Sequence, residues 1–204
     1  FFHCCYMLRV LCRNLYIKFF LDSHNLDKRL LRQAVTHSSF ANEQKINKYE
    51  DYERLEFLGD AVLELVSSEF LFQENKQMTE GQLTRLRASI VCEQALAYCA
   101  REFGLEEFIL LGKGEEMTGG RTKDSIVSDT LESIIGAIYI DNGMEPATAF
   151  IRRFILSDLE HKKLFYDAKT ILQEYVSYDS RNSVMKLKDY FIRKRLKSLY
   201  LDTF

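Results

Sequence analysis

The segment 53–72 constrains the fold of this chain more than any other. Its apolar residues recur every three or four positions, and Gly59 is the only glycine or proline within it. That period is typical of a helix with one buried face. The apolar stripe consists of Leu55, Leu58, Val62, Leu65 and Val66. The segment therefore predicts a long core helix on which other helices can pack.

The scarcity of turn-forming residues extends this prediction to the rest of the chain. Only 9 glycines and 1 proline occur among 204 residues, whereas sandwiches and barrels of strands use many of both in their turns. Further amphipathic helices are expected over 27–36, from residue 79 toward residue 99, over 125–139 and over 146–159. Thr79 and Gln82 have the spacing of a capping box at the start of the second of these. We expect an all-α fold.

The cysteines and the N-terminal segment bear on where the protein resides. An odd number of cysteines in a chain of this size favours reduced thiols, and no second pair completes a zinc site. The cysteines are Cys4, Cys5, Cys12, Cys92 and Cys99. Arg9, Arg13 and Lys18 interrupt the apolar N-terminal segment, so no run reaches the roughly 18–20 residues that span a membrane. We expect a cytoplasmic protein with no membrane partner.

Acidic residues border the apolar faces of two of the expected helices. Glu53, Glu56 and Asp60 share one face at spacings of three and four residues, and Asp129 and Glu132 are three residues apart. Acids beside an apolar stripe need a partner, and a divalent cation suits carboxylate oxygens that converge from two helices. Ordinary surface acids on amphipathic helices remain the alternative interpretation of this spacing.

The histidines narrow the choice of metal. A carboxylate-bridged di-iron bundle uses Glu-x-x-His pairs, and none of His3, His24, His37 and His161 lies three residues after a glutamate. Oxygen ligands alone favour Mg²⁺, for which Mn²⁺ can substitute. His37 lies beside two serines without a third member of a catalytic triad, so we expect it to have a structural or capping role.

The glycine-rich segment 112–123 raises the question of a phosphate site. It lacks the G-x-x-x-x-G-K-[ST] pattern of a P-loop and no strand is expected before it, so we expect no nucleotide cofactor. Arg121 and Lys123, within this segment, are candidates for contacts with a nucleic-acid backbone.

Five segments of the sequence, in the right order, resemble the ribonuclease III family. The sequence ERLEFLGDAVLELV at 53–66 resembles the family's signature helix, and the other four segments are 36–43, 79–91, 112–141 and 169–176. The resemblance covers about residues 26–176. It implies an all-helical endonuclease domain that forms a homodimer and cleaves double-stranded RNA during the processing of ribosomal and messenger RNA.

The resemblance also implies roles for individual residues. Phe57 matches an aromatic residue that inserts into the partner subunit. Asp60 and Glu132, with Glu53 and Glu80 as accessory acids, match the catalytic residues. The matches to the metal ligands are Glu56, Asp60, Asp129 and Glu132. The implied reaction is attack of water assisted by Mg²⁺, which leaves 5′-phosphate and 3′-hydroxyl ends. A non-cleaving RNA-binding or assembly protein, or a helical scaffold with surface acids, is the alternative.

The resemblance weakens toward both ends of the chain. Segment 169–176 resembles the first helix of a double-stranded-RNA-binding domain, in which Gln173 matches a residue that faces the RNA minor groove. No three-strand pattern follows, and residues 181–204 carry seven basic and two acidic residues. We therefore expect a helical extension over 1–21, a catalytic domain over 22–160, and a linker, truncated RNA-binding segment and basic tail over 161–204.

Overall fold

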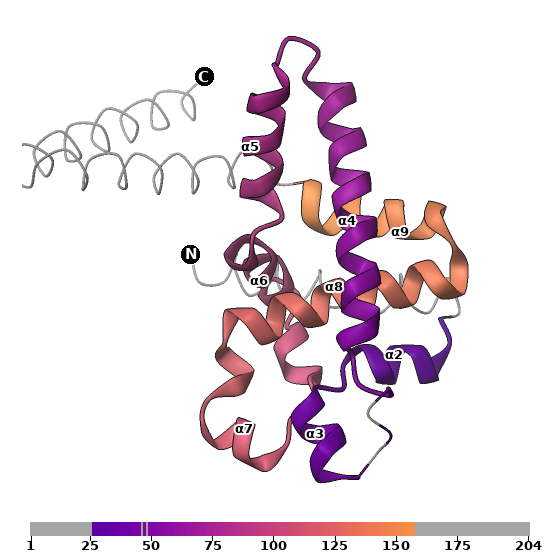
Figure 1. The fold of residues 1–204 in the computed structure, drawn as a ribbon, viewed down its shortest axis with the longest axis vertical. Helices are drawn as coiled ribbons and strands as arrows, with labels where there is room; N and C mark the ends of the chain where they lie inside the picture. Colours follow the sequence, from indigo (N-terminus) through magenta and orange to yellow (C-terminus); the bar gives the residue numbers. More distant parts are fainter. Residues whose placement is uncertain (1–25, 46, 48, 158–204) are drawn as a thin grey trace, which may run out of the picture. The chain divides into compact units, whose positions relative to one another are not determined.

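A computed structural model describes residues 26–45, 47 and 49–157 of the chain, and these residues form a helical fold (Figure 1). No β-strand occurs among them, and an isolated bridge between Thr36 and Leu110 is their single sheet-like contact. The expected all-α fold is therefore confirmed. No helix in this part of the chain is long and apolar enough to cross a membrane.

The described elements are eight α-helices and three short helical turns. The short turns are the 3₁₀ turns η1 (Leu105–Phe108) and η2 (Gly120–Thr122) and the π-helical turn η3 (Arg152–Leu156). The α-helices are α2 (Lys28–Ala34), α3 (Ser38–Glu43), α4 (Glu53–Glu74), α5 (Glu80–Ile90), α6 (Glu93–Arg101), α7 (Lys113–Met117), α8 (Asp124–Asn142) and α9 (Met144–Ile151).

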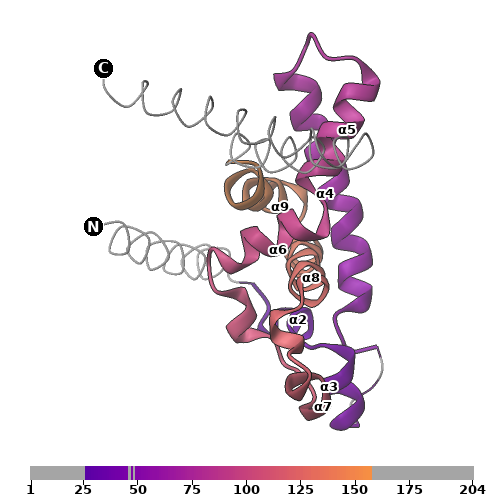
Figure 2. The ribbon, with the colours of Figure 1, turned by 90° about the vertical axis from the view of Figure 1, so that its left-hand side faces the viewer.

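Helix α8 is the centre of the core. It packs against α2, α4, α6 and α9, and the view of Figure 2 looks nearly along α8 while α4 stands upright beside it. Its fully buried side chains include Val127, Leu131, Ile135 and Ile138. Because it is covered on most sides, its acids at Asp129 and Glu132 lie close to apolar surroundings.

Two glycines allow α4 and α8 to cross at backbone contact. A Cβ atom on Gly59 would collide with the carbonyl group of Glu132 and would lie 2.9 Å from the backbone nitrogen of Gly136. A Cβ atom on Gly136 would likewise collide with the backbone carbonyl of Leu55. Only hydrogen fits between the helices here, so the absence of side chains at both positions fixes how closely the two acidic helices approach.

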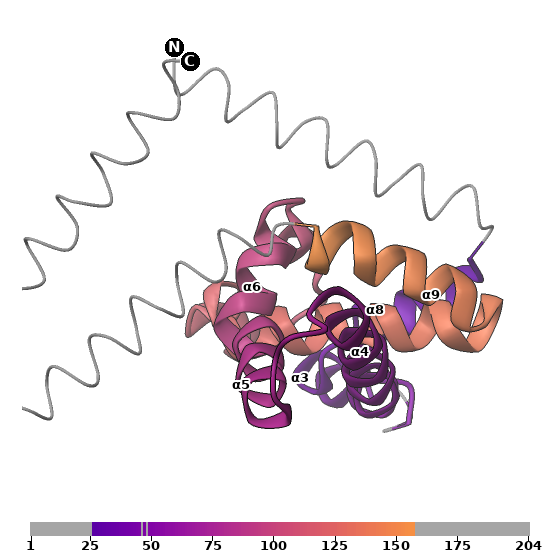
Figure 3. The ribbon, with the colours of Figure 1, turned by 90° about the horizontal axis from the view of Figure 1, so that it is seen from above.

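Helices α4 and α5 form an antiparallel hairpin at the top of Figure 1, and Figure 3 shows α5 beside α4. The predicted capping box starts α5: the side-chain oxygen of Gln82 accepts a hydrogen bond from the Thr79 backbone N–H at 2.9 Å. The continuous helix expected from residue 79 toward residue 99 is wrong. Cys92 has extended backbone angles and starts α6, so each half buries its own apolar side.

The last expected helix is also shorter than the pattern suggested. Within the described part of this segment, α9 ends at Ile151 and is followed by the wider turn η3, in which Phe154, Ile155 and Leu156 are buried. Backbone contacts divide the chain into two units, Phe1–Leu159 and Glu160–Phe204. The expected N-terminal extension, the C-terminal RNA-binding segment and Gln173 lie outside the described residues.

Candidate metal centre

Three of the four predicted metal ligands meet where α4 crosses α8. Glu56 comes from α4, and Asp129 and Glu132 come from successive turns of α8. One carboxylate oxygen from each of the three lies within 4.8 Å of the others, and all three residues are half-buried. The glycine contact one turn along α4, between Gly59 and Glu132, brings these side chains together. We call Glu56, Asp129 and Glu132 the carboxylate group.

Burial and mutual repulsion raise the pKa values of the two glutamates in this group. Burial, reinforced by the charges of Asp129, Glu53 and Asp60, raises the pKa of Glu56 to about 7. Burial, with the charges of Asp60, Asp129 and Glu56, raises the pKa of Glu132 to about 8. The charges that act on these two glutamates are negative, so no basic side chain in the described part of the chain is seen to compensate them.

Asp129 has a more mixed environment. Burial raises its pKa most, whereas hydrogen bonds from the hydroxyl groups of Ser128 and Tyr52 act in the opposite direction. Tyr52 is 3% exposed and is the residue at which α4 starts, so its position is fixed. Sequence reasoning missed Tyr52, although a tyrosine immediately before the acidic helix was a usable signal.

The group fits a divalent, oxygen-preferring cation. Two oxygens bound to one Mg²⁺ at about 2.0–2.1 Å lie at most about 4.2 Å apart, so a small contraction of the observed group would satisfy the ion. A bound cation would also offset the repulsion that raises the pKa values of Glu56 and Glu132. The residues present therefore match the chemistry of a magnesium or manganese ion.

The remaining predicted acids of α4 border the group without joining it. Asp60 is exposed, one turn after Glu56, and its charge raises the pKa values of Glu56 and Glu132. Glu53, one turn before Glu56, is also exposed and acts on Glu56. Sequence reasoning missed a further acid, Glu64, whose charge acts on Glu132 and whose i+4 spacing from Asp60 placed it on the same face.

Glu80 is not brought to the group within one chain. It is the first residue of α5 and accepts a hydrogen bond from the hydroxyl of Thr84 at 2.8 Å. The hairpin places it near the end of α4 at Glu74, and the 18 residues from Glu56 to Glu74 span about 27 Å of helix. A contribution of Glu80 to this centre therefore requires a second copy of the chain.

An apolar stripe runs along the neighbouring face of α4. Phe57, predicted to contact a partner subunit, is 80% exposed, and Leu65 and Phe72 further along the helix are also exposed. Leu65 and Phe72 line a groove of about 380 Å³ between α4 and α5, with Leu71 and Leu83. Large apolar side chains gathered on one exposed face are typical of a surface that is covered in an assembly.

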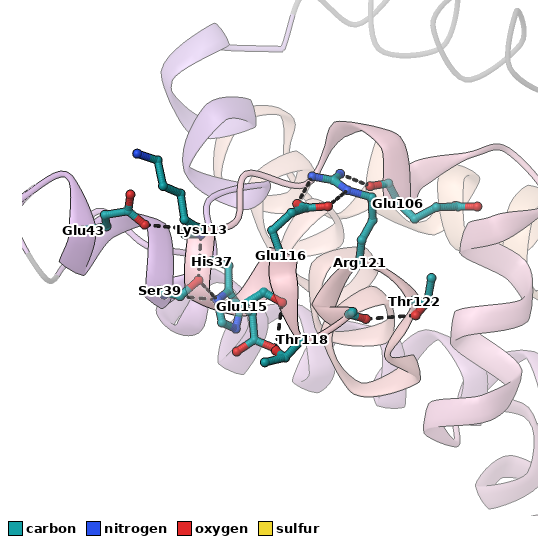
Figure 4. A network of polar contacts seen from close by, with 12 residues as sticks. His37, Ser39, Glu43, Glu106, Lys113, Glu115, Glu116, Thr118, Arg121 and Thr122 are labelled. Carbon is teal, nitrogen blue, oxygen red and sulfur yellow. Dashed lines mark hydrogen bonds and ion pairs between the residues drawn. The ribbon is translucent and has the colours of Figure 1, made fainter.

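Arg121 and Lys123, the predicted contacts to a nucleic-acid backbone, each pair with a glutamate of α7, and Figure 4 shows the pair of Arg121 with Glu116. Arg121 donates from Nε and Nη2 to the carboxylate of Glu116 at 2.9 and 2.6 Å, and from Nη1 to the backbone carbonyl of Glu106 at 2.6 Å. Lys123 contacts the carboxylate of Glu115 at 2.6 Å. These bonds lower the pKa values of both glutamates and hold segment 112–123 in place.

His37 has the structural role expected of it. It starts α3, and its Nδ1 atom accepts the backbone N–H of Ser39 at 3.1 Å. Its ring lies edge-on to Tyr52 with the ring centroids 5.5 Å apart, and burial lowers its pKa. Ser39 in turn accepts the backbone N–H of Gly112 at 3.0 Å, which links α3 to the segment before α7.

Comparison with known proteins identifies the family. A protein-family model described as Ribonuclease-III-like matches residues 27–159. Ribonuclease 3 of Shouchella clausii is 50% identical over 163 residues, which cover 79% of this chain and 63% of the relative, and Ribonuclease 3 of Staphylococcus aureus strain Newman is 48% identical over 162 residues, which cover 78% and 66%. The chain thus spans about two thirds of the length of these relatives.

Solved structures agree with the sequence relatives. A nuclease domain of ribonuclease III from Campylobacter jejuni, described as flexible in the region involved in dimer formation, has a TM-score of 0.61 and 44% identity. The match covers 68% of this chain and 95% of that domain, and a second structure of the same domain has a TM-score of 0.61 and 43% identity over 70% and 95%. The helical architecture, the crossing acidic helices and these relatives together show that the chain belongs to the ribonuclease-III-like family.

Proposed function

We propose that this protein is an endonuclease that hydrolyses double-stranded RNA with the help of Mg²⁺, for which Mn²⁺ can substitute. The observation that carries the proposal is the carboxylate group at the crossing of α4 and α8, in a chain of this family. Glu56, Asp129 and Glu132, joined by Asp60, are the proposed metal ligands. Asp60, Glu132, Glu53 and Glu80 are the proposed catalytic acids.

The chemistry follows from the charge state of the group. A bound divalent ion lowers the pKa of water and stabilises a leaving 3′ oxygen. Glu56 and Glu132 must lose their protons to serve as ligands, so their raised pKa values couple metal binding to pH. Hydrolysis by water requires no protein nucleophile and leaves 5′-phosphate and 3′-hydroxyl ends. His37 and Ser39 are engaged in capping α3, in agreement with this scheme.

The proposed substrate is recognised by shape. A protein reads an RNA duplex mainly through phosphates and 2′-hydroxyls. Gln173, Arg121 and Lys123 are the proposed RNA contacts, and for Arg121 and Lys123 the phosphates would exchange with Glu116 and Glu115. A role in the processing of ribosomal and messenger RNA in the cytoplasm, without a nucleotide cofactor, completes the proposal.

The proposed active form is a homodimer. Phe57 and the apolar stripe of α4 supply the contact surface, because they are exposed in the single chain. A two-fold dimer through α4 would also supply each carboxylate group with the Glu80 of the partner subunit. This arrangement accounts for the distance of about 27 Å along α4 that separates Glu80 from Glu56 in one chain.

The proposal is tested by incubating the full chain with a long RNA duplex at low salt, with Mg²⁺ or with EDTA. Low salt preserves the phosphate contacts on which binding depends. We expect short duplexes with 5′-phosphate ends in Mg²⁺, none in EDTA, and at least about a hundredfold loss of rate in Glu132→Gln. Glu74→Gln, at an exposed position at the end of α4, is the control and should cleave normally.

The outcome that contradicts the proposal is equally defined. A folded dimer that binds the duplex without cutting it in Mg²⁺ or Mn²⁺ would instead support the non-cleaving RNA-binding or assembly protein. Cleavage that persists in Glu132→Gln would place the chemistry outside the carboxylate group.

A further inference from the structure

A further acid borders the carboxylate group without belonging to it. Glu64 follows Asp60 by one turn of α4, on the helix face that also carries Glu56. The charge of Glu64 reaches Glu132 and contributes to its raised pKa. The side chain of Glu64 is 36% exposed. A free carboxylate at this position would be available to a cation bound beside Asp60.

Arg87 of α5 holds this acid in place. Its Nε atom lies 3.0 Å from the Glu64 carboxylate, and its Nη1 atom donates to the hydroxyl of Ser68 at 2.7 Å. That hydroxyl donates in turn to the backbone carbonyl of Glu64 at 2.6 Å. The guanidinium is thus anchored to two neighbouring side chains of one turn of α4, a planar two-point contact that lysine cannot reproduce.

This anchoring sets how much negative charge the centre presents. The charges acting on Glu56 and Glu132 are already negative, so an additional unpaired carboxylate would strengthen the attraction for a divalent cation and alter its ligands. The ion pair between α4 and α5 keeps the Glu64 carboxylate engaged with Arg87.

We propose that Arg87 is a positioning residue of the metal centre: its guanidinium keeps the Glu64 carboxylate turned toward α5, so that Glu64 does not become a ligand beside Asp60. The inference rests on the proposed function in taking the carboxylate group as a cation site. Exposed ion pairs are individually weak, and the second anchor at Ser68 is what gives this one a fixed geometry.

The test measures Mn²⁺ binding to the metal-free full chain in the absence of RNA, by electron paramagnetic resonance of the free ion. In Arg87→Met the released Glu64 should tighten binding by about three- to tenfold. Arg87→Lys keeps the charge but loses the fork, and should tighten binding by about twofold or more. Adding Glu64→Gln to Arg87→Met should return the affinity to within about twofold of the unmodified chain.

Matched variants separate positioning from charge and from folding. Arg85→Met removes a positive charge at an exposed position of the same helix and should leave Mn²⁺ affinity unchanged. Ser68→Ala removes one of the two anchors and should give a smaller shift in the same direction as Arg87→Met, which keeps the test available if Arg87→Met unfolds. Circular dichroism and the melting temperature establish that each variant is folded.

Different failures have different meanings. If the unmodified chain binds Mn²⁺ and Arg87→Lys binds it equally well, the positioning role is overturned while the proposed function stands. An elevated affinity that persists in the double variant would also overturn it. If the unmodified chain binds no Mn²⁺, the cation site itself is refuted, and the role of Arg87 fails with it.

Discussion

Gly59 of α4 lies against the backbone carbonyl of Glu132 in α8, with no room for a side chain between them. The contact falls one turn after Glu56 and at one of the acids of α8, so the closest approach of the two helices coincides with the carboxylate group. The distance of Glu56 from Asp129 and Glu132 therefore depends on Gly59, a residue without a functional side chain.

The first prediction concerns this contact. Gly59→Ala places a methyl group on the backbone of α8, so the helices must move apart, and overpacking of this kind typically costs about 1–3 kcal/mol. We expect the melting temperature to fall by several degrees and Mn²⁺ affinity to fall with it. Gly81→Ala, at a helical glycine with no atom within 4 Å of the added Cβ, is the control and should be neutral or slightly stabilising. Unchanged Mn²⁺ affinity in Gly59→Ala would contradict the prediction.

A second prediction is that Glu132, one of the proposed catalytic acids, destabilises the metal-free fold. At pH 8.5 the unmodified protein must ionise Glu132 among negative charges, whereas Glu132→Gln removes that charge with little change in shape. We expect metal-free Glu132→Gln to melt about 2–4 °C above the unmodified protein, which corresponds to about 1 kcal/mol. Glu74→Gln, at an exposed position at the end of α4, should not shift the melting temperature. A lower melting temperature for Glu132→Gln would show that the carboxylate is structurally required.

The third prediction concerns pH. The pKa of Glu56 is raised from 4.5 to about 7 and that of Glu132 from 4.5 to about 8. At a pH between the ordinary and the raised pKa of each group, the folded protein therefore holds more protons than the unfolded protein. Stability therefore falls as pH rises from about 5 to about 8.5. We expect the metal-free melting temperature to decrease across this range in calorimetry, and Mg²⁺ to restore it most at the alkaline end. A metal-free melting temperature that rises with pH over this range would exclude the raised values.

A fourth prediction concerns the assembly. Phe57 is 80% exposed, so Phe57→Ala removes few contacts within the chain but truncates the most exposed aromatic side chain of the α4 stripe. We expect the helical content to be unchanged and the dimer dissociation constant to rise by about 30-fold or more, measured by sedimentation. Phe108→Ala, at a 66% exposed phenylalanine in η1, is the control and should dimerise normally. Equal dissociation constants for the two variants would remove the stripe from the dimer contact.

The sequence anticipated the features that depend on local spacing. Each of these features can be recognised within a single helix: the apolar period of α4, the capping box at Thr79 and the pairing of acids three residues apart. The break between α5 and α6 was not predicted, because apolar spacing continues across Cys92 while the backbone turns. Distances between helices could not be predicted either: nothing local to Glu80 indicates that it lies far from the carboxylate group of its own chain.

The partners of polar side chains depended on tertiary structure as well. The sequence predicted Arg121 and Lys123 only as contacts to a nucleic-acid backbone, and both pair with glutamates of α7. The same holds for Tyr52, whose hydrogen bond to Asp129 joins residues far apart in the sequence. Such pairings require knowledge of which elements meet, which a single sequence supplies only where a motif is recognised.

The acids and the apolar stripe occupy adjacent faces of one uninterrupted helix, α4. If two copies associate through the stripe, the same rigid rod fixes both the two-fold axis and the offset of each carboxylate group from that axis. Under the proposed function, the spacing between the two cuts in an RNA duplex would then be a length set by α4. Insertions in the surrounding loops would leave this spacing unchanged. A single residue added within α4 between Glu56 and Phe72 would rotate the acidic face against the apolar face by about 100°.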